Sequence, residues 1–136
     1  MAETNTQDNT FSVKIITPER VFFEGSATLL EFRSGEGQIG VLKGHVPTVC
    51  IIEPGVLHIH NGSEERKAAV HNGFAQIMQD HVSVLAEIAE WPEEIDLNRA
   101  KEAKIRAERR ISEGSDDMAR DELALRRAMA RIEAID

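Results

Sequence analysis

The composition of the chain changes abruptly at Trp91-Pro92, and this change limits the folds that the chain can adopt. All five phenylalanines, all five histidines and eight of the nine glycines come before Pro92, whereas residues 92–136 contain no aromatic side chain. Residues 92–136 carry 12 acidic and 10 basic side chains, a much denser mixture of charge than that of residues 1–91. A change this sharp predicts two structural units, residues 1–91 and residues 92–136.

The first unit has the pattern of an antiparallel β-sandwich. Phe11, Val13 and Ile15 alternate with polar residues, which is typical of a half-buried strand. Turn signals then recur at roughly 8–12-residue spacing, as in sandwiches and flattened barrels. Asn61-Gly62 is a strong hairpin signal, and Asn72-Gly73 is interpreted as a further turn. We therefore expect about ten short strands.

The second unit has the pattern of two amphipathic helices joined by a short loop. We expect Asp96 to cap the first helix and Gly114 to end it in a left-handed conformation, with Asp116 or Asp117 capping the second helix. The apolar stripes consist largely of alanine, so that two such helices are marginally stable alone and need a surface to lie against. The expected fold class is α+β, mainly β: an antiparallel β-sandwich followed by an antiparallel two-helix hairpin that is loosely held.

Charge and composition exclude several classes of protein. The net charge of −8 argues against nucleic acid and anionic lipid as general partners. No run of 18 apolar residues is present, so we expect no transmembrane helix. Cys50 is the single cysteine, which excludes an internal disulfide and a cysteine zinc cluster.

No residues in the pattern of a catalytic or metal site stand out. The glycine-rich stretch 35–47, GEGQIGVLKGHVP, contains GxGxxG, but no helix can start after it to bind a phosphate. His45 in this stretch has no apparent nucleophile beside it. His58 and His60 share one face of a strand, but no third ligand is apparent, so we expect exposed strand histidines and no metal site. The chain is therefore not expected to be an enzyme.

The arginines of the second unit are grouped by face. Arg99 and Arg106 are seven residues apart and share a face of the first helix, as Arg127 and Arg131 do on the second. One interpretation is a solvated face with pairs of charges within each helix. The other is a clamp for phosphate or a contact with an acidic surface, because arginine offers planar, bidentate hydrogen bonding. The residues alone leave both open.

Four stretches of the chain resemble the epsilon subunit of bacterial F-type ATP synthases. Residues 35–47 are similar to the signature loop of this family, with Lys43 where the family usually has proline. Residues 53–57, residues 72–74 and the helix start 95–100 resemble the family in the same order. The resemblance covers about residues 11–133.

The resemblance implies a non-catalytic subunit of the rotor, with no required cofactor. The sandwich would dock on the gamma subunit and on the membrane c-ring, peripheral to the cytoplasmic side of the cell membrane. The helical hairpin would switch between a folded state beside the sandwich and an extended state along gamma. In the extended state Arg126 and Arg127 would reach acidic residues on the catalytic beta subunits, in the head of alpha and beta subunits, and block ATP hydrolysis.

The helix start resembles the family motif I/L-D-x-x-R-A, which in some members binds one ATP without hydrolysing it. The resemblance assigns the contacts with such a regulatory ATP to eight residues: Glu90, Ile95, Asp96, Arg99, Ala100, Arg106, Arg127 and Arg131. It places Glu90 near the adenine and the last three arginines near the phosphates.

An alternative keeps the same fold and assigns it another role. In this interpretation the chain is a free-standing β-sandwich binding module, and the hairpin is a dimerisation tail that buries its thin apolar stripes against a second copy.

Overall fold

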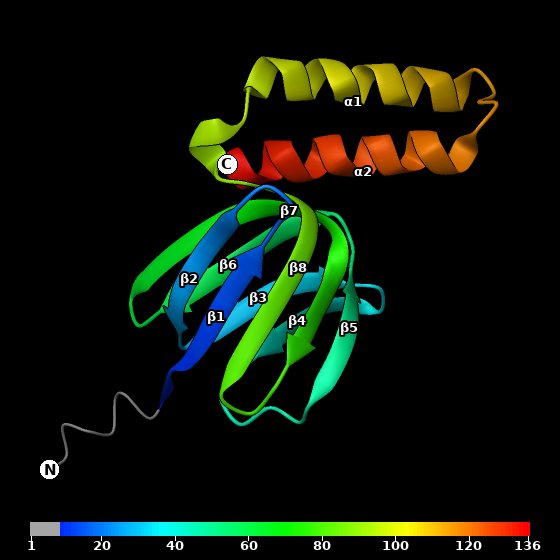
Figure 1. Cartoon of the computed structure of the whole chain (residues 1–136). Helices are drawn as coiled ribbons and strands as arrows, with labels where there is room; N and C mark the ends of the chain where they lie inside the picture. Colours follow the sequence, from blue (N-terminus) through cyan, green and yellow to red (C-terminus); the bar gives the residue numbers. More distant parts are fainter. Residues whose placement is uncertain (1–8) are drawn as a thin grey trace, which may run out of the picture.

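Strands occupy the first two thirds of the chain and helices the last third in the computed structural model, which describes residues 9–136 (Figure 1). The elements are β1 (Phe11–Ile16), β2 (Val21–Ala27), β3 (Leu29–Ser34), β4 (Gly37–Val41), β5 (Thr48–Ile52), β6 (Gly55–Asn61), β7 (Glu64–Ile77), β8 (His81–Glu90), the 3-10 turn η2 (Pro92–Glu94), α1 (Leu97–Ser112) and α2 (Met118–Ile135). The predicted fold class, a mainly β sandwich followed by a two-helix hairpin, is confirmed.

The strands pair in the order β2-β1-β8-β7-β5-β3-β4, and β6 pairs with both β3 and β7. This pairing curls them into two layers, as Figure 1 shows. The core between the layers is largely aliphatic, as alternating strands of this composition require. Its largest fully buried side chains include Phe32, Ile15, Leu30, Ile52 and Leu57.

The prediction of about ten strands is wrong because Asn72-Gly73 does not end a strand. Residues 9–136 contain eight strands, and β7 runs for 14 residues through this dipeptide. Asn72 has a φ of 50° and Gly73 a φ of 157°, so the backbone changes which side chains face the core. Val70 is buried before this point and Ala75 after it, which reverses the alternation. The first half of β7 pairs with β6 and the second half with β5.

The prediction that the sheet is antiparallel is wrong for one pair. Strand β1 runs parallel to β8, with Ser12 opposite His81 and Ile16 opposite Leu85. The other strand pairs within residues 9–136 are antiparallel. Alternating polarity identifies a strand and its buried face, but it carries no information about the direction of a neighbour that lies 69 positions away in the chain.

The first helix begins and ends where the sequence predicts, and the second begins at Asp117, one of the two caps that the sequence offered. The Asp96 carboxylate accepts a hydrogen bond from the Arg99 N–H (3.1 Å), and the Asp117 carboxylate accepts one from the Arg120 N–H (3.1 Å). Gly114 has a φ of 86° in the connection between the helices. No helix in the described part of the chain combines the length and the apolar character that crossing a bilayer requires.

Helix α2 makes the main contact with the sandwich, and α1 lies on the outer side of α2 (Figure 1). The apolar part of the contact is small: Val56 and Ala69 of the sandwich pack with Ala134 of α2 and with Ile95. Charged groups surround it. Such a contact holds the hairpin with far less apolar burial than the core of the sandwich has.

We predict that Gly73→Ala strongly destabilises the sandwich. A Cβ atom at Gly73 would lie 2.0 Å from the Leu85 carbonyl oxygen and 2.8 Å from the Ala86 Cα, and its φ of 157° disfavours any side chain. The expected loss of unfolding free energy is on the order of 3 kcal/mol in urea denaturation. Gly35→Ala is the control, because a Cβ there meets nothing within 4 Å. Equal stability of the two variants would contradict the prediction.

Candidate functional site

A cavity of about 420 Å³ lies where the end of β8, the segment before α1, and both helices meet. Its lining consists of Glu90, Glu94, Ile95, Asp96, Arg99, Ala100, Ala103, Arg106 and Arg131. Seven of the eight residues that the sequence assigns to a nucleotide therefore line one cavity.

Arg127 is the exception. Its Nη2 donates to the Asn72 Oδ1 at 2.7 Å and lies 3.3 Å from the Glu87 Oε1, so that it holds α2 on the sandwich outside the cavity lining. Sequence spacing puts Arg127 and Arg131 on one face of α2, but four residues along a helix advance by about 6 Å. The two guanidinium groups therefore reach different parts of the sandwich.

The helix α1 supplies one wall of the cavity through residues that recur every three or four positions. Asp96, Arg99, Ala103 and Arg106 lie on this face, because such spacing follows one side of a helix. Ala100 is buried beside them. The short alanine side chains leave space between α1 and the sandwich that longer side chains would fill.

Glu90 joins the sandwich to α2 at the edge of the cavity. Its Oε1 accepts a hydrogen bond from the Arg131 Nε–H at 2.7 Å and lies 3.4 Å from the His71 Nε2. Partial burial opposes the charged form of Glu90, but the hydrogen bonds from His71 and Arg131 outweigh it and lower the pKa of Glu90. The carboxylate is therefore ionised at neutral pH and pairs with Arg131.

The segment that enters α1 is anchored to the sandwich at Trp91. The indole stacks on Phe22 with a centroid distance of 4.1 Å, and the Arg66 guanidinium lies 3.8 Å from the indole centroid. The backbone N–H of Trp91 donates to the Glu94 carboxylate, which also accepts from the Arg20 Nη2 at 2.8 Å. The hydrogen bond from Arg20 lowers the pKa of Glu94. The boundary between the two units is thus fixed at its sandwich end.

Two cations of the cavity lining have no partner within residues 9–136. The guanidinium groups of Arg99 and Arg106 make no hydrogen bond or ion pair there, whereas Arg131 is paired with Glu90. Unpaired arginines on one wall of a cavity suit an anion with several oxygens, because each guanidinium presents five N–H donors. The arrangement can hold a phosphate chain, and it has a carboxylate, Glu90, at its sandwich end.

Apolar side chains form an exposed row across β5, β7 and β8. Ile51 lies opposite Phe74 and Phe74 lies opposite Leu85, with 61%, 42% and 40% of these residues exposed. Val49, which is near the start of β5, and Val46, which precedes β5, are also exposed. We call Ile51, Phe74 and Leu85 the apolar row. An exposed apolar group that spans three strands is typical of a surface that binds another protein.

The sequence missed a third side chain beside His58 and His60. The two strands are joined by Gly62 and Ser63, which pairs His60 with Glu65, and the Glu65 carboxylate lies next to both rings. The expectation that no third ligand is near is therefore wrong. A turn at Asn61-Gly62 itself would have paired His60 with Ser63, so the shift of the turn by one residue decided which side chain lies opposite His60.

Comparison with known proteins gives matches along both units of the chain. Residues 10–92 match the family described as ATP synthase, Delta/Epsilon chain, beta-sandwich domain, and residues 93–136 match the long alpha-helix domain of the same chain. The ATP synthase epsilon chain of Ruminiclostridium cellulolyticum is 46% identical over 127 residues, covering 92% of this chain and 95% of the relative. The epsilon chain of Clostridium novyi is 41% identical over 128 residues, covering 93% of this chain and 98% of the relative.

Solved structures give matches of the same kind. A chain in the Euglena gracilis mitochondrial ATP synthase, in a structure of OSCP, F1 and the c-ring, superposes with a TM-score of 0.78 at 26% identity, covering 93% of this chain and 81% of that chain. A chain in the Tetrahymena thermophila mitochondrial ATP synthase, in a structure of the central stalk and c-ring, has a TM-score of 0.53 at 15% identity, covering 62% of this chain and 68% of that chain. The second likeness concerns the fold alone.

We predict that His71 makes stability depend on pH between about 5 and 7. His71 is fully buried, its Nδ1 has no partner among the described residues, and burial lowers its pKa in spite of Glu90 nearby, while Arg127 and Arg131 lower it further. Below its ordinary pKa of about 6.5 the unfolded chain binds a proton that the folded chain does not, so that the unfolding free energy falls as the pH falls.

The slope that His71 contributes to the unfolding free energy is at most about 1.4 kcal/mol per pH unit. Glu90, whose pKa is lowered in the folded chain, lowers the unfolding free energy further as the pH falls below about 4.5. Urea unfolding between pH 5 and 8 measures the slope. His71→Gln should flatten the curve in this range. If the plots of unfolding free energy against pH were parallel for the original chain and for His71→Gln, His71 would not be the source of the pH dependence.

Proposed function

The chain belongs to the delta/epsilon family of ATP synthase subunits, and on this premise we propose that it is a non-catalytic subunit of the rotating central stalk. In this role the sandwich docks on the gamma subunit and the c-ring, at the cytoplasmic side of the cell membrane and without entering it. The likeness to a chain of the Euglena gracilis ATP synthase, solved with its c-ring, supports these contacts. Both units match the delta/epsilon family, which favours the role of a stalk subunit over that of a binding module with a helical dimerisation tail.

The apolar row is the surface that we assign to rotor docking. Its three side chains come from adjacent strands of a rigid sheet, so that they keep their spacing during rotation. The hairpin contacts β6 and β7 elsewhere on the sandwich, which leaves the row available in the folded state. A rigid apolar surface of this kind binds through burial and requires little ordering of side chains.

We propose that the helical hairpin regulates ATP hydrolysis by leaving the sandwich. Two arginines of α2 are occupied in the folded state: Arg126 pairs with Glu53 at 2.9 Å, and Arg127 binds Asn72. Ion pairs that are exposed to water contribute about 0–1 kcal/mol each. Release of α2 therefore frees Arg126 and Arg127 at a modest cost, and they can then meet acidic side chains on the catalytic head.

We further propose that ATP stabilises the folded state by binding in the cavity. Arg99 and Arg106 would hold the phosphates together with Arg131, Glu90 would accept a hydrogen bond from the adenine amino group, and Ile95, Asp96 and Ala100 would line the base and ribose. The cavity needs the end of β8 and both helices, so that it exists in the folded state alone. A ligand that binds one of two states shifts the population toward that state. The observation that carries this proposal is the pair of unpartnered arginines.

Isothermal titration of the full chain with ATP tests the cavity. We expect saturable binding, and at least a tenfold loss of affinity for Arg99→Ala and for Arg106→Ala, because a hydrogen bond to a charged group contributes about 1.5–3 kcal/mol. Arg109→Ala is the matched control, since Arg109 is on the same helix but outside the cavity lining. Absence of heat at millimolar ATP, or equal affinity of all variants, would remove the proposal.

Substitution in the apolar row tests the docking surface separately. Ile51→Asp and Phe74→Asp should weaken co-purification with the gamma subunit at least tenfold, because each places a charge in an apolar contact. Val21→Asp is the control, at a residue that is 52% exposed on β2, at the far end of the sheet from β5. If the row variants bind gamma as well as the control does, the sandwich docks through another surface.

A further inference from the structure

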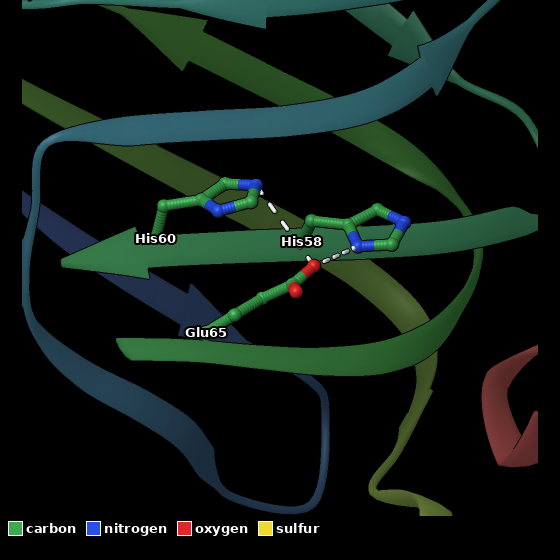
Figure 2. A group of neighbouring side chains, drawn as sticks. All are labelled: His58, His60 and Glu65. Atoms are coloured by element: carbon green, nitrogen blue, oxygen red, sulfur yellow. Dashed lines mark hydrogen bonds and ion pairs between the residues drawn. The ribbon is translucent and has the colours of Figure 1, made fainter. Parts of the chain in front are cut away.

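Two histidines and two glutamates gather on the outer face of three adjacent strands, away from the cavity and from the apolar row. His58 and His60 are on β6, Glu65 is on β7 and Glu31 is on β3. The pairing register places His60 opposite Glu65, and Glu31 opposite His58. Figure 2 shows the two rings and the Glu65 carboxylate turned toward one another above the sheet.

The ligand atoms are close to the spacing that a metal ion requires. One ring nitrogen of each histidine and one oxygen of Glu65 all lie within 4.8 Å of one another. The His58 Nδ1 is 2.6 Å from the Glu65 Oε2, and the His60 Nε2 is 3.9 Å from the same oxygen. Bonds of about 2.0–2.2 Å to a tetrahedral zinc ion place neighbouring ligands roughly 3.3–3.5 Å apart. Small rotations of the side chains, which move the ligand atoms by about an ångström, would produce this geometry without any movement of the sheet.

The strands hold the two rings in place. Leu57 and Ile59, which alternate with the histidines, are buried in the core, so that β6 cannot rotate to turn the rings away. The rings are nearly parallel, with 15° between their planes and 6.1 Å between their centroids. The side chains of His58 and His60 are 31% and 26% exposed, so that an ion can reach them from solvent.

Carboxylates lie directly beside the rings, whereas the nearest arginines lie on the side of His58 that faces α2. The Glu65 Oε2 is 2.6 Å from the His58 Nδ1. Arg33 and Arg126 share a pocket with His58, and Arg126 is paired there with Glu53 at 2.9 Å. The Glu31 Oε1 lies 2.8 Å from the His60 Nε2 and adds a second carboxylate. Lys67 shares this face of β7, but its Nζ donates to the Asp136 carbonyl oxygen at 2.7 Å and so is engaged away from the rings.

We propose that His58, His60 and Glu65 form a binding site for a divalent transition metal of the zinc class, with Glu31 as a further oxygen ligand. Two imidazoles with carboxylates suit Zn²⁺, Ni²⁺ or Cu²⁺, whereas Mg²⁺ and Ca²⁺ require oxygen ligands. The bound ion links β3, β6 and β7. Val56 and Ala69, on β6 and β7, are the residues on which α2 rests, so that the ion stiffens the surface beneath the hairpin.

A single histidine beside a single carboxylate lacks the second imidazole that the proposed site has. The chain contains such a pair, which serves as a comparison. His81 lies 2.8 Å from the Asp80 carboxylate on the surface. No second imidazole belongs to a metal-sized group with His81 within residues 9–136. This pair therefore separates metal coordination from simple hydrogen bonding to a carboxylate.

Calorimetric titration of the full chain, prepared without a histidine tag, with Zn²⁺ alone tests the site. We expect one ion per chain with a dissociation constant in the micromolar range, and a melting temperature that rises with Zn²⁺ and returns after chelation. Mg²⁺ at the same concentration should have no effect. His60→Gln and Glu65→Gln should each weaken binding at least tenfold, whereas His81→Gln should not.

Co²⁺ provides a second measurement, because it gives visible absorption bands when nitrogen and oxygen ligands surround it in a tetrahedron. Glu65→Gln keeps the size of an exposed side chain, so circular dichroism should show a folded variant whose Co²⁺ bands are lost. The proposal is overturned if the chain shows no saturable Zn²⁺ binding below millimolar concentration. It is overturned equally if His60→Gln and Glu65→Gln bind Zn²⁺ as tightly as His81→Gln does.

Discussion

The contact between Arg131 and Glu90 is the interaction on which the arrangement of the two units depends. The 2.7 Å hydrogen bond joins α2 to the last residue of β8, whose carboxylate also lies 3.4 Å from the Nε2 of the buried His71. The same two side chains line the cavity. Docking of the hairpin and formation of the cavity are therefore one event, and whatever binds in the cavity also bears on the position of α2.

The contrast between the two units suits the proposed function, in which the sandwich transmits rotation and the hairpin changes its position. The sandwich has a continuous, largely aliphatic core, and each of its strands is hydrogen-bonded to a neighbouring strand in one sheet. Such a body is expected to be rigid. The hairpin rests on it through Val56, Ala69 and Ala134, through the partly buried pair of Arg131 and Glu90, and through exposed pairs such as that of Arg126 with Glu53. Small side chains bury little area, and exposed ion pairs contribute little, so that this contact can open while the core stays intact.

The change of face at Asn72-Gly73 connects the surfaces that the proposed function uses. Before this point the outer residues of β7 include Ala69, which lies beneath α2. After it the outer residue is Phe74, in the middle of the apolar row. Arg127 of α2 binds the Asn72 side chain at the change itself. One strand thus carries the docking site of the hairpin and the surface assigned to the rotor, and a local feature of the backbone separates them.

The sequence by itself determined what depends on neighbours in the chain. The sandwich, the hairpin, the cap at Asp96, a second cap at Asp116 or Asp117, and the face of α1 that lines the cavity all follow from periodicity and short-range hydrogen bonds. The tertiary structure alone decided the unbroken β7, the parallel pairing of β1 with β8, the separation of Arg127 from Arg131, and the arrival of Glu31 beside His60. These features rest on contacts between distant segments, which local pattern does not encode because alternation and helical spacing fix a buried face but not the partner that covers it.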